Sequence, residues 1–150
     1  MSDLRDLYQE LILDHGKSPR NLRNMEESTN QANGYNPVCG DKVELYLLLE
    51  DGVVRDACFE GSGCAISTAS ASMLTQAILG KSIEAIRQLR LEVGKMLTAE
   101  PGGSEDFQAL GKLAAFSGVC EFPNRVKCAT LAWHTLDAAL GDDLNMISTE

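Results

Sequence analysis

The stretch KVELYLLLEDGVVRDACF, residues 42–59, carries the clearest structural pattern in the chain. Val43 and Leu45 alternate with Lys42 and Glu44, and this two-residue period is typical of a half-buried β-strand. The following Glu50-Asp51-Gly52 favours a tight turn. We therefore predict a β-hairpin whose second strand runs to about Phe59.

The segments outside this hairpin have helical patterns, apart from one polar loop. Residues 16–38 are rich in Asn, Ser, Gly and Pro, so we expect a loop there with a short strand near residues 32–35. Because strands come early and helices follow, we predict an α+β fold in which helices pack on one face of a small antiparallel sheet. The predicted helices cover residues 4–16, 65–79, 82–97, 104–116 and 125–140.

The bulk properties limit the kinds of partner that the protein can have. A chain of 150 residues is the size of one domain, so we expect a single domain over residues 1–150, with a flexible acidic tail from about residue 141. A net charge of −9 repels phosphate backbones and argues against a nucleic-acid partner. The apolar runs are too short to cross a membrane, and the first residues do not resemble a signal peptide. We expect a soluble, cytoplasmic protein.

Five cysteines are the unusual feature of this composition. In a reducing compartment, thiols serve as metal ligands, as reactive groups or as small core residues. Cys39 directly precedes the predicted hairpin, while Cys64 and Cys128 lie where predicted helices begin. The helix dipole and unpaired N–H groups there favour the thiolate, which is the form that binds metals. These three cysteines are therefore candidate metal ligands.

Asp41 is the candidate for a fourth ligand, since zinc prefers four tetrahedral ligands. It lies two residues after Cys39, so in an extended chain both side chains point to the same face. Three thiolates and one carboxylate around Zn²⁺ carry a net charge of −2. Arg125 and Lys127, beside Cys128, could offset this charge.

The remaining cysteines and the histidines have weaker claims to the site. Cys58 lies within the second predicted strand, where we expect a packed core residue. Cys120 lies in a predicted loop eight residues before Cys128 and could approach the site as an auxiliary thiol. We expect His134 to pack or to lie at the surface, and His15 to interact with the C-terminal dipole of the first helix.

Three cysteine motifs, taken together, resemble a known family. They are NPVCGD at residues 36–41, GSGCAIS at residues 61–67 and RVKCATLAW at residues 125–133. The N-terminal DHGKSPRN, residues 14–21, is similar to the opening motif of the same family. The chain resembles the IscU-like (NifU N-terminal-like) iron–sulfur cluster assembly proteins, and specifically their SufU branch, from residue 4 to about residue 140.

The resemblance implies a site of three cysteines and one aspartate, and a partner that delivers sulfur. The implied partner is a pyridoxal-phosphate-dependent cysteine desulfurase (SufS-like), whose active-site persulfide supplies the sulfur. A downstream iron–sulfur assembly complex is the second expected partner. IscU-type scaffolds carry a histidine directly before the third cysteine, where this chain has Lys127. The stretch between Cys64 and Cys128, which includes residues 100–104, is also longer than in IscU-type scaffolds. Both features resemble the SufU branch, whose members are zinc-dependent sulfurtransferases.

Two other functions fit the same ligands. A scaffold that assembles a [2Fe–2S] cluster also uses cysteine thiolates. A structural zinc protein that only binds partners is the third reading, although the chain lacks the C-x-x-C pairs common in such modules. For sulfur transfer, Cys39 is the predicted sulfur acceptor, because a loop between Pro37 and Gly40 lets it leave the metal more easily than Cys64 or Cys128.

Overall fold

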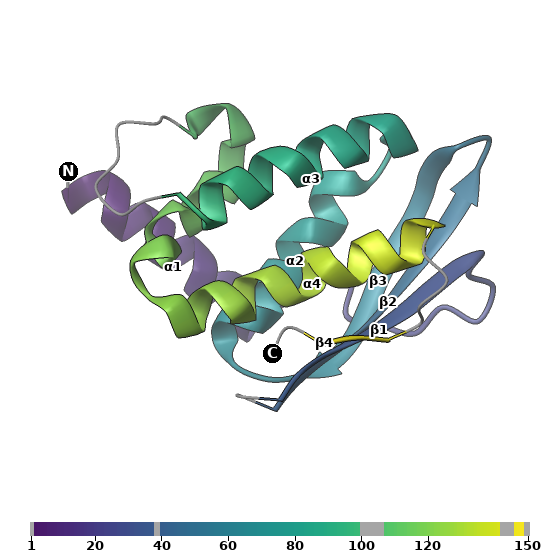
Figure 1. Cartoon of the computed structure of the whole chain (residues 1–150), viewed down its shortest axis with the longest axis horizontal. Coiled ribbons are helices and arrows are strands. Elements are labelled where there is room, and N and C mark those ends of the chain that lie inside the picture. The colour runs from purple at the N-terminus through teal and green to yellow at the C-terminus, as the bar shows by residue number, and fades with distance from the viewer. Residues whose placement is uncertain (1, 38–39, 100–106, 142–145, 149–150) are drawn as a thin grey trace.

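The computed structural model describes residues 2–37, 40–99, 107–141 and 146–148. Helices lie on one face of a twisted sheet, as Figure 1 shows, so the predicted α+β class and layer arrangement are confirmed. The elements follow one another as α1 (Ser2–Lys17), β1 (Asn30–Asn36), β2 (Asp41–Glu50), β3 (Val53–Ser62), α2 (Ala65–Ile78), α3 (Ile83–Leu97), η1 (Gln108–Glu121), α4 (Pro123–Gly141) and β4 (Met146–Ser148).

The sheet has the strand order β3-β2-β1-β4. The predicted hairpin of β2 and β3 is confirmed, and β1 pairs antiparallel with the other side of β2. β1 is longer than the short strand expected at residues 32–35, and its last residue, Asn36, is paired with Asp41 at the start of β2. Val43, Leu45 and Leu47 are buried under the helices, because side chains two residues apart share one face of a strand.

Of the predicted flexible tail after residue 141, the structure describes only residues 146–148. Met146–Ser148 forms β4, which pairs parallel with residues 33–35 of β1. This strand extends the otherwise antiparallel sheet by one parallel member. The single-domain assignment itself stays a prediction.

α2 is the central helix of the protein. It contacts α1, α4 and β3, and in Figure 1 it lies among the other helices above the sheet. Its N-terminus follows β3 after only Gly63 and Cys64. Several small hydroxyl side chains on α2 are buried, which lets neighbouring elements approach it closely: Ser67, Ser70, Ser72 and Thr75.

The prediction of an α-helix over residues 104–116 is wrong. Within the described residues, this region is the 3₁₀ helix η1, interrupted at Gly111, where φ is 61°. Consecutive residues 113–116 are all buried, so the segment lacks the 3.6-residue period of an amphipathic α-helix. The other predicted helices are confirmed to within about two residues at their ends.

Within the described residues, none of the helices combines the length and the apolar character that a membrane span requires.

The helix-facing side of β2 supports a stability prediction. Leu45 is fully buried, whereas Lys42, three residues earlier on the same strand, is exposed on the opposite face. Leu45→Ala should lower the free energy of unfolding by about 2–5 kcal/mol through lost burial and a residual cavity. Lys42→Ala should change it by less than about 0.5 kcal/mol. Urea unfolding of both variants checks this, and equal effects would contradict the assigned faces.

Candidate metal centre

Asp41 is the first described residue of the candidate site. It opens β2 on the helix-facing side and is 1% exposed. Its Oδ1 accepts a hydrogen bond from the Cys64 backbone N–H at 2.9 Å. A Cβ on Gly63 would collide with this carboxylate, so the glycine between β3 and Cys64 leaves the room that Asp41 occupies.

Cys64 is the N-cap residue of α2, as the sequence predicts. Its Sγ accepts a hydrogen bond from the Ser67 N–H at 3.4 Å and lies 3.7 Å from Asp41 Oδ2. The N–H groups and the dipole of the helix N-terminus stabilise a thiolate at this position. The residue is partly exposed, unlike Asp41 and Cys128, which are buried.

Cys128 reaches the site from α4, but its place in that helix differs from the prediction. α4 begins at Pro123, so Cys128 is in the second turn rather than the first, and the dipole acts on it less. Its side chain is 4% exposed. The neighbouring Ala129 carbonyl accepts a hydrogen bond from Ser70 Oγ of α2 at 2.6 Å, which ties the two cysteine-bearing helices together.

The potential ligand atoms of Asp41, Cys64 and Cys128 all lie within 4.8 Å of one another. Two sulfurs and one carboxylate oxygen at this spacing can bind a single zinc ion, which takes thiolate and carboxylate ligands at about 2.0–2.3 Å after small adjustments. The structure therefore brings together three of the four predicted ligands from three different elements. Cys39, the fourth, lies outside the described residues.

Comparison with known proteins identifies the family. A model of the NifU-like N-terminal domain matches residues 7–142. The chain belongs to the NifU-like N-terminal domain family. It is 42% identical, over 95% of both chains, to the zinc-dependent sulfurtransferase SufU of Bacillus subtilis strain 168. It is also 42% identical, over 89% of this chain and 92% of the other, to the iron–sulfur cluster assembly scaffold protein IscU of Thermotoga maritima.

A solved structure has the same fold as this chain. The crystal structure of a candidate iron–sulfur cluster assembly scaffold protein for the SUF system, from Fervidobacterium islandicum AW-1, aligns with a TM-score of 0.80 and 35% identity. It covers 88% of this chain, and this chain covers 95% of it. The predicted resemblance to the IscU-like and SufU proteins is confirmed.

The predicted charge-compensating residues of this NifU-like chain stay a prediction. Arg125 is exposed, and its guanidinium lies 4.6 Å from the centre of the Phe122 ring, a cation–π contact. Lys127 is half-buried in the first turns of α4. Both lie within three residues of Cys128, but the described contacts do not join either to Asp41 or Cys64.

Cys58 is a packed thiol, as expected. It is fully buried on β3, and burial raises its pKa, so it remains protonated and unreactive. Cys120 belongs to η1, and its side chain lies outside the described part of the structure.

His15 lies in the last turn of α1, as predicted, but it also makes a contact that was not predicted. It is 2% exposed, and its Nδ1 is 2.7 Å from Ser72 Oγ, so it joins α1 to α2 instead of only interacting with the helix dipole. A signal in the sequence for a role of His15 is that DHGKSPRN, residues 14–21, is similar to the opening motif of the family. The motif alone does not identify Ser72 as the partner.

The two histidines support a prediction for the pH dependence of stability. Burial, followed by Arg20, lowers the pKa of His15 below 6.5, and burial, followed by Arg90, lowers the pKa of His134. In both cases the unfolded chain binds protons more readily than the folded one. Their stabilising contribution is therefore complete above pH 6.5 and is lost as the pH falls through the folded-state pKa values.

We expect the urea concentration at the unfolding midpoint of the metal-free protein to decrease as the pH is lowered from 7.5 to 5.5. The exposed carboxyls of Asp14 and Glu60, with their lowered pKa values, titrate below this window. The combined His15→Gln and His134→Gln variant should lose most of this pH dependence. An unchanged slope in that variant would exclude the histidines as its source.

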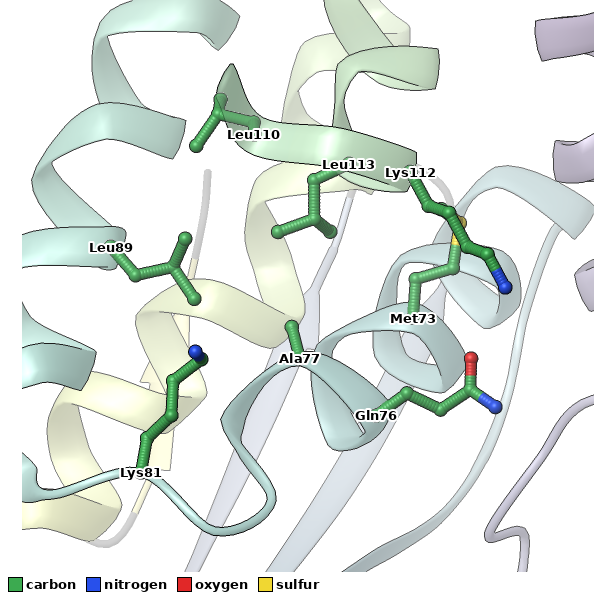
Figure 2. A pocket seen from close by; sticks show the side chains of 8 residues that line it. All are labelled: Met73, Gln76, Ala77, Lys81, Leu89, Leu110, Lys112 and Leu113. Atoms are coloured by element: carbon green, nitrogen blue, oxygen red, sulfur yellow. The ribbon is translucent and has the colours of Figure 1, made fainter. Parts of the chain in front are cut away.

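A cavity of about 480 Å³ lies away from the metal centre, between α2, α3 and η1. Figure 2 shows Leu89, Leu113 and Ala77 around its apolar interior, with Lys81 and Lys112 reaching along its edges. It adjoins the C-terminal half of α2, whereas Cys64 caps the N-terminus of that helix. The cavity therefore does not belong to the candidate metal centre of the NifU-like chain.

Proposed function

We propose that this protein is a zinc-dependent sulfurtransferase that accepts sulfur from the persulfide of a cysteine desulfurase for iron–sulfur cluster assembly. The proposal rests on the convergence of Asp41, Cys64 and Cys128, whose potential ligand atoms lie within 4.8 Å of one another and can bind one zinc ion. The 42% identity to the B. subtilis sulfurtransferase supports it independently. We propose a pyridoxal-phosphate-dependent, SufS-like desulfurase as the partner, acting with this protein in the cytoplasm.

Cys39 is the proposed fourth zinc ligand and sulfur acceptor. Only Gly40 separates it from Asp41 in the sequence, so the Cα atoms of Cys39 and Asp41 are at most about 7 Å apart whatever the local conformation. The paired residues Asn36 and Asp41 flank the connection that contains it. Cys64 is anchored at a helix cap and Cys128 within a helix, which leaves Cys39 as the ligand whose departure disturbs the least structure.

The proposed transfer moves one sulfur atom between two cysteines. Zinc, when bound, keeps the resting thiolates deprotonated and is itself redox-inert. The Cys39 thiolate attacks the outer sulfur of the desulfurase persulfide, and the sulfur–sulfur bond of that persulfide breaks. The desulfurase cysteine leaves as a thiolate, and Cys39 carries the sulfane sulfur. No net oxidation accompanies this exchange.

The cluster scaffold is the second candidate, since the T. maritima scaffold protein is equally identical to this chain. Thiolates bind iron–sulfur clusters as well as zinc. A purely structural zinc site would enclose its ligands, whereas Cys64 is partly exposed, which argues against that third function.

Transfer from a SufS-like desulfurase tests the proposal. The zinc-loaded protein should accelerate alanine release from cysteine by the desulfurase and should carry sulfane sulfur after separation from it. A protein that neither stimulates the desulfurase nor gains sulfur would contradict the sulfurtransferase assignment.

A further inference from the structure

The N-terminal motif DHGKSPRN is part of the family resemblance but supplies none of the proposed ligands. It covers the end of α1 and the start of the segment that leads to β1. Residues 15–23, here named the tether segment, contact both elements that flank Cys64. Cys64 and Gly63 form the whole junction between β3 and α2, so the angle between these elements decides where the Cys64 sulfur lies.

One half of the tether segment is bonded to α2. The Arg20 N–H donates to Ser72 Oγ at 2.8 Å, and the same hydroxyl is 2.7 Å from His15 Nδ1. The Asn21 side-chain amide donates to Thr75 Oγ1 at 3.0 Å. Ser72 and Thr75 are both fully buried, so water cannot replace these partners.

The other half of the tether segment is bonded to β3. The Phe59 N–H donates to the Asn21 carbonyl at 2.9 Å, and the Arg23 N–H donates to the Phe59 carbonyl at 2.9 Å. Asn21 thus bonds to α2 through its side chain and to β3 through its backbone. These bonds fix the strand before Cys64 relative to the helix after it.

A third contact lies directly beside Cys64. Gly16, in the last turn of α1, packs so closely on Ala65 that a Cβ at residue 16 would lie 3.1 Å from the Ala65 Cβ and 3.2 Å from its carbonyl oxygen. A side chain there would press on the first residue of α2. The end of α1 therefore limits the position of the residue next to the ligand.

We propose that the tether segment is a positioning device for the metal centre, which fixes the β3–α2 junction and thereby holds Cys64 against Asp41 and Cys128. α2 is also held by the Ser70 bond to Ala129. Cys64 is six residues from Ser70, about 9 Å along the helix, so a tilt of about 5° around that contact would move its Cα by roughly 0.8 Å. A shift of this size exceeds the tolerance of about 0.2 Å on metal–ligand distances, so it should weaken metal binding.

The tether inference builds on the proposed function, because it takes Asp41, Cys64 and Cys128 as metal ligands. Zinc affinity, measured by chelator competition without any desulfurase, tests it. Ser72→Ala should weaken zinc binding on the order of tenfold, as is typical when residues that orient ligands are lost. Gly16→Ala should weaken it less, in the same direction. Both should change the visible absorption of the Co²⁺-substituted protein, which reports the geometry of the ligands.

Val93→Ala is the matched control, because Val93 is 1% exposed on α3, which supplies no proposed ligand. It should lower thermal stability but leave zinc affinity within about twofold of the parent. If Ser72→Ala does not fold, the zinc affinity of Gly16→Ala alone tests the tether inference.

Parent-like zinc affinity and Co²⁺ absorption in the folded tether variants would overturn the inference, as would an equal loss of affinity in Val93→Ala. If the parent protein binds zinc but accepts no sulfur, the proposed function fails while the comparison among variants still stands.

Discussion

Asp41→Ala should weaken zinc binding by about 100-fold or more and remove most sulfur transfer. The change deletes the one proposed oxygen ligand, and ligand loss directly reduces metal affinity. It also removes the acceptor of the Cys64 N–H, which anchors the N-terminus of α2 beside the site. Chelator competition measures the affinity, and the desulfurase assay measures the transfer.

Asp41→Asn separates the two roles of this carboxylate. The amide oxygen can still accept the Cys64 N–H bond but lacks the negative charge that favours Zn²⁺. We expect Asp41→Asn to keep parent-like thermal stability without metal while losing most of the zinc affinity. If Asp41→Ala retains zinc as tightly as the parent protein, Asp41 is not a ligand.

Cys39→Ala should abolish the stable transfer of sulfur to this protein, with a loss on the order of 100-fold. The reason is chemical, since the proposed acceptor thiolate is absent and Cys64 and Cys128 are anchored by their helices. Incubation with a desulfurase and labelled cysteine, followed by mass spectrometry of the separated chain, measures the sulfane sulfur that it carries.

Cys58→Ala is the matched control for this measurement. It also removes one thiol, but a fully buried one whose raised pKa keeps it protonated. Its zinc content and sulfur uptake should equal those of the parent protein. Undiminished uptake in Cys39→Ala would disprove the assignment of the acceptor, and mass spectrometry would then identify the cysteine that replaces it.

The sequence predicts most of the fold because its patterns are local. Alternation around Leu45 predicts the hairpin, and Ser82 predicts the start of α3, where its Oγ accepts the Ala85 N–H at 3.1 Å. β4 escapes prediction because a three-residue strand is too short to have a period and depends on the edge of β1. The conformation of η1 could not be predicted because its apolar residues are consecutive, so its conformation depends on tertiary packing and not on a local pattern.

The candidate site is predicted in composition but not in detail. Residue types and positions in the sequence lead to the prediction of Asp41, Cys64 and Cys128 as ligands, and the structure places their potential ligand atoms within 4.8 Å of one another. The hydrogen bond from Cys64 to Asp41 and the contact between His15 and Ser72 join residues far apart in sequence, and no local pattern contains them. The predicted position of Cys128 in the first turn is wrong because Pro123 begins α4 two residues before the predicted start.

Metal and sulfide analysis of protein purified without oxygen from iron-replete cells tests the central assignment most directly. For a zinc-dependent sulfurtransferase, we predict about one zinc ion per chain, bound at one four-ligand site, and no acid-labile sulfide. Iron with a matching amount of labile sulfide would contradict this assignment and identify the protein as a cluster scaffold.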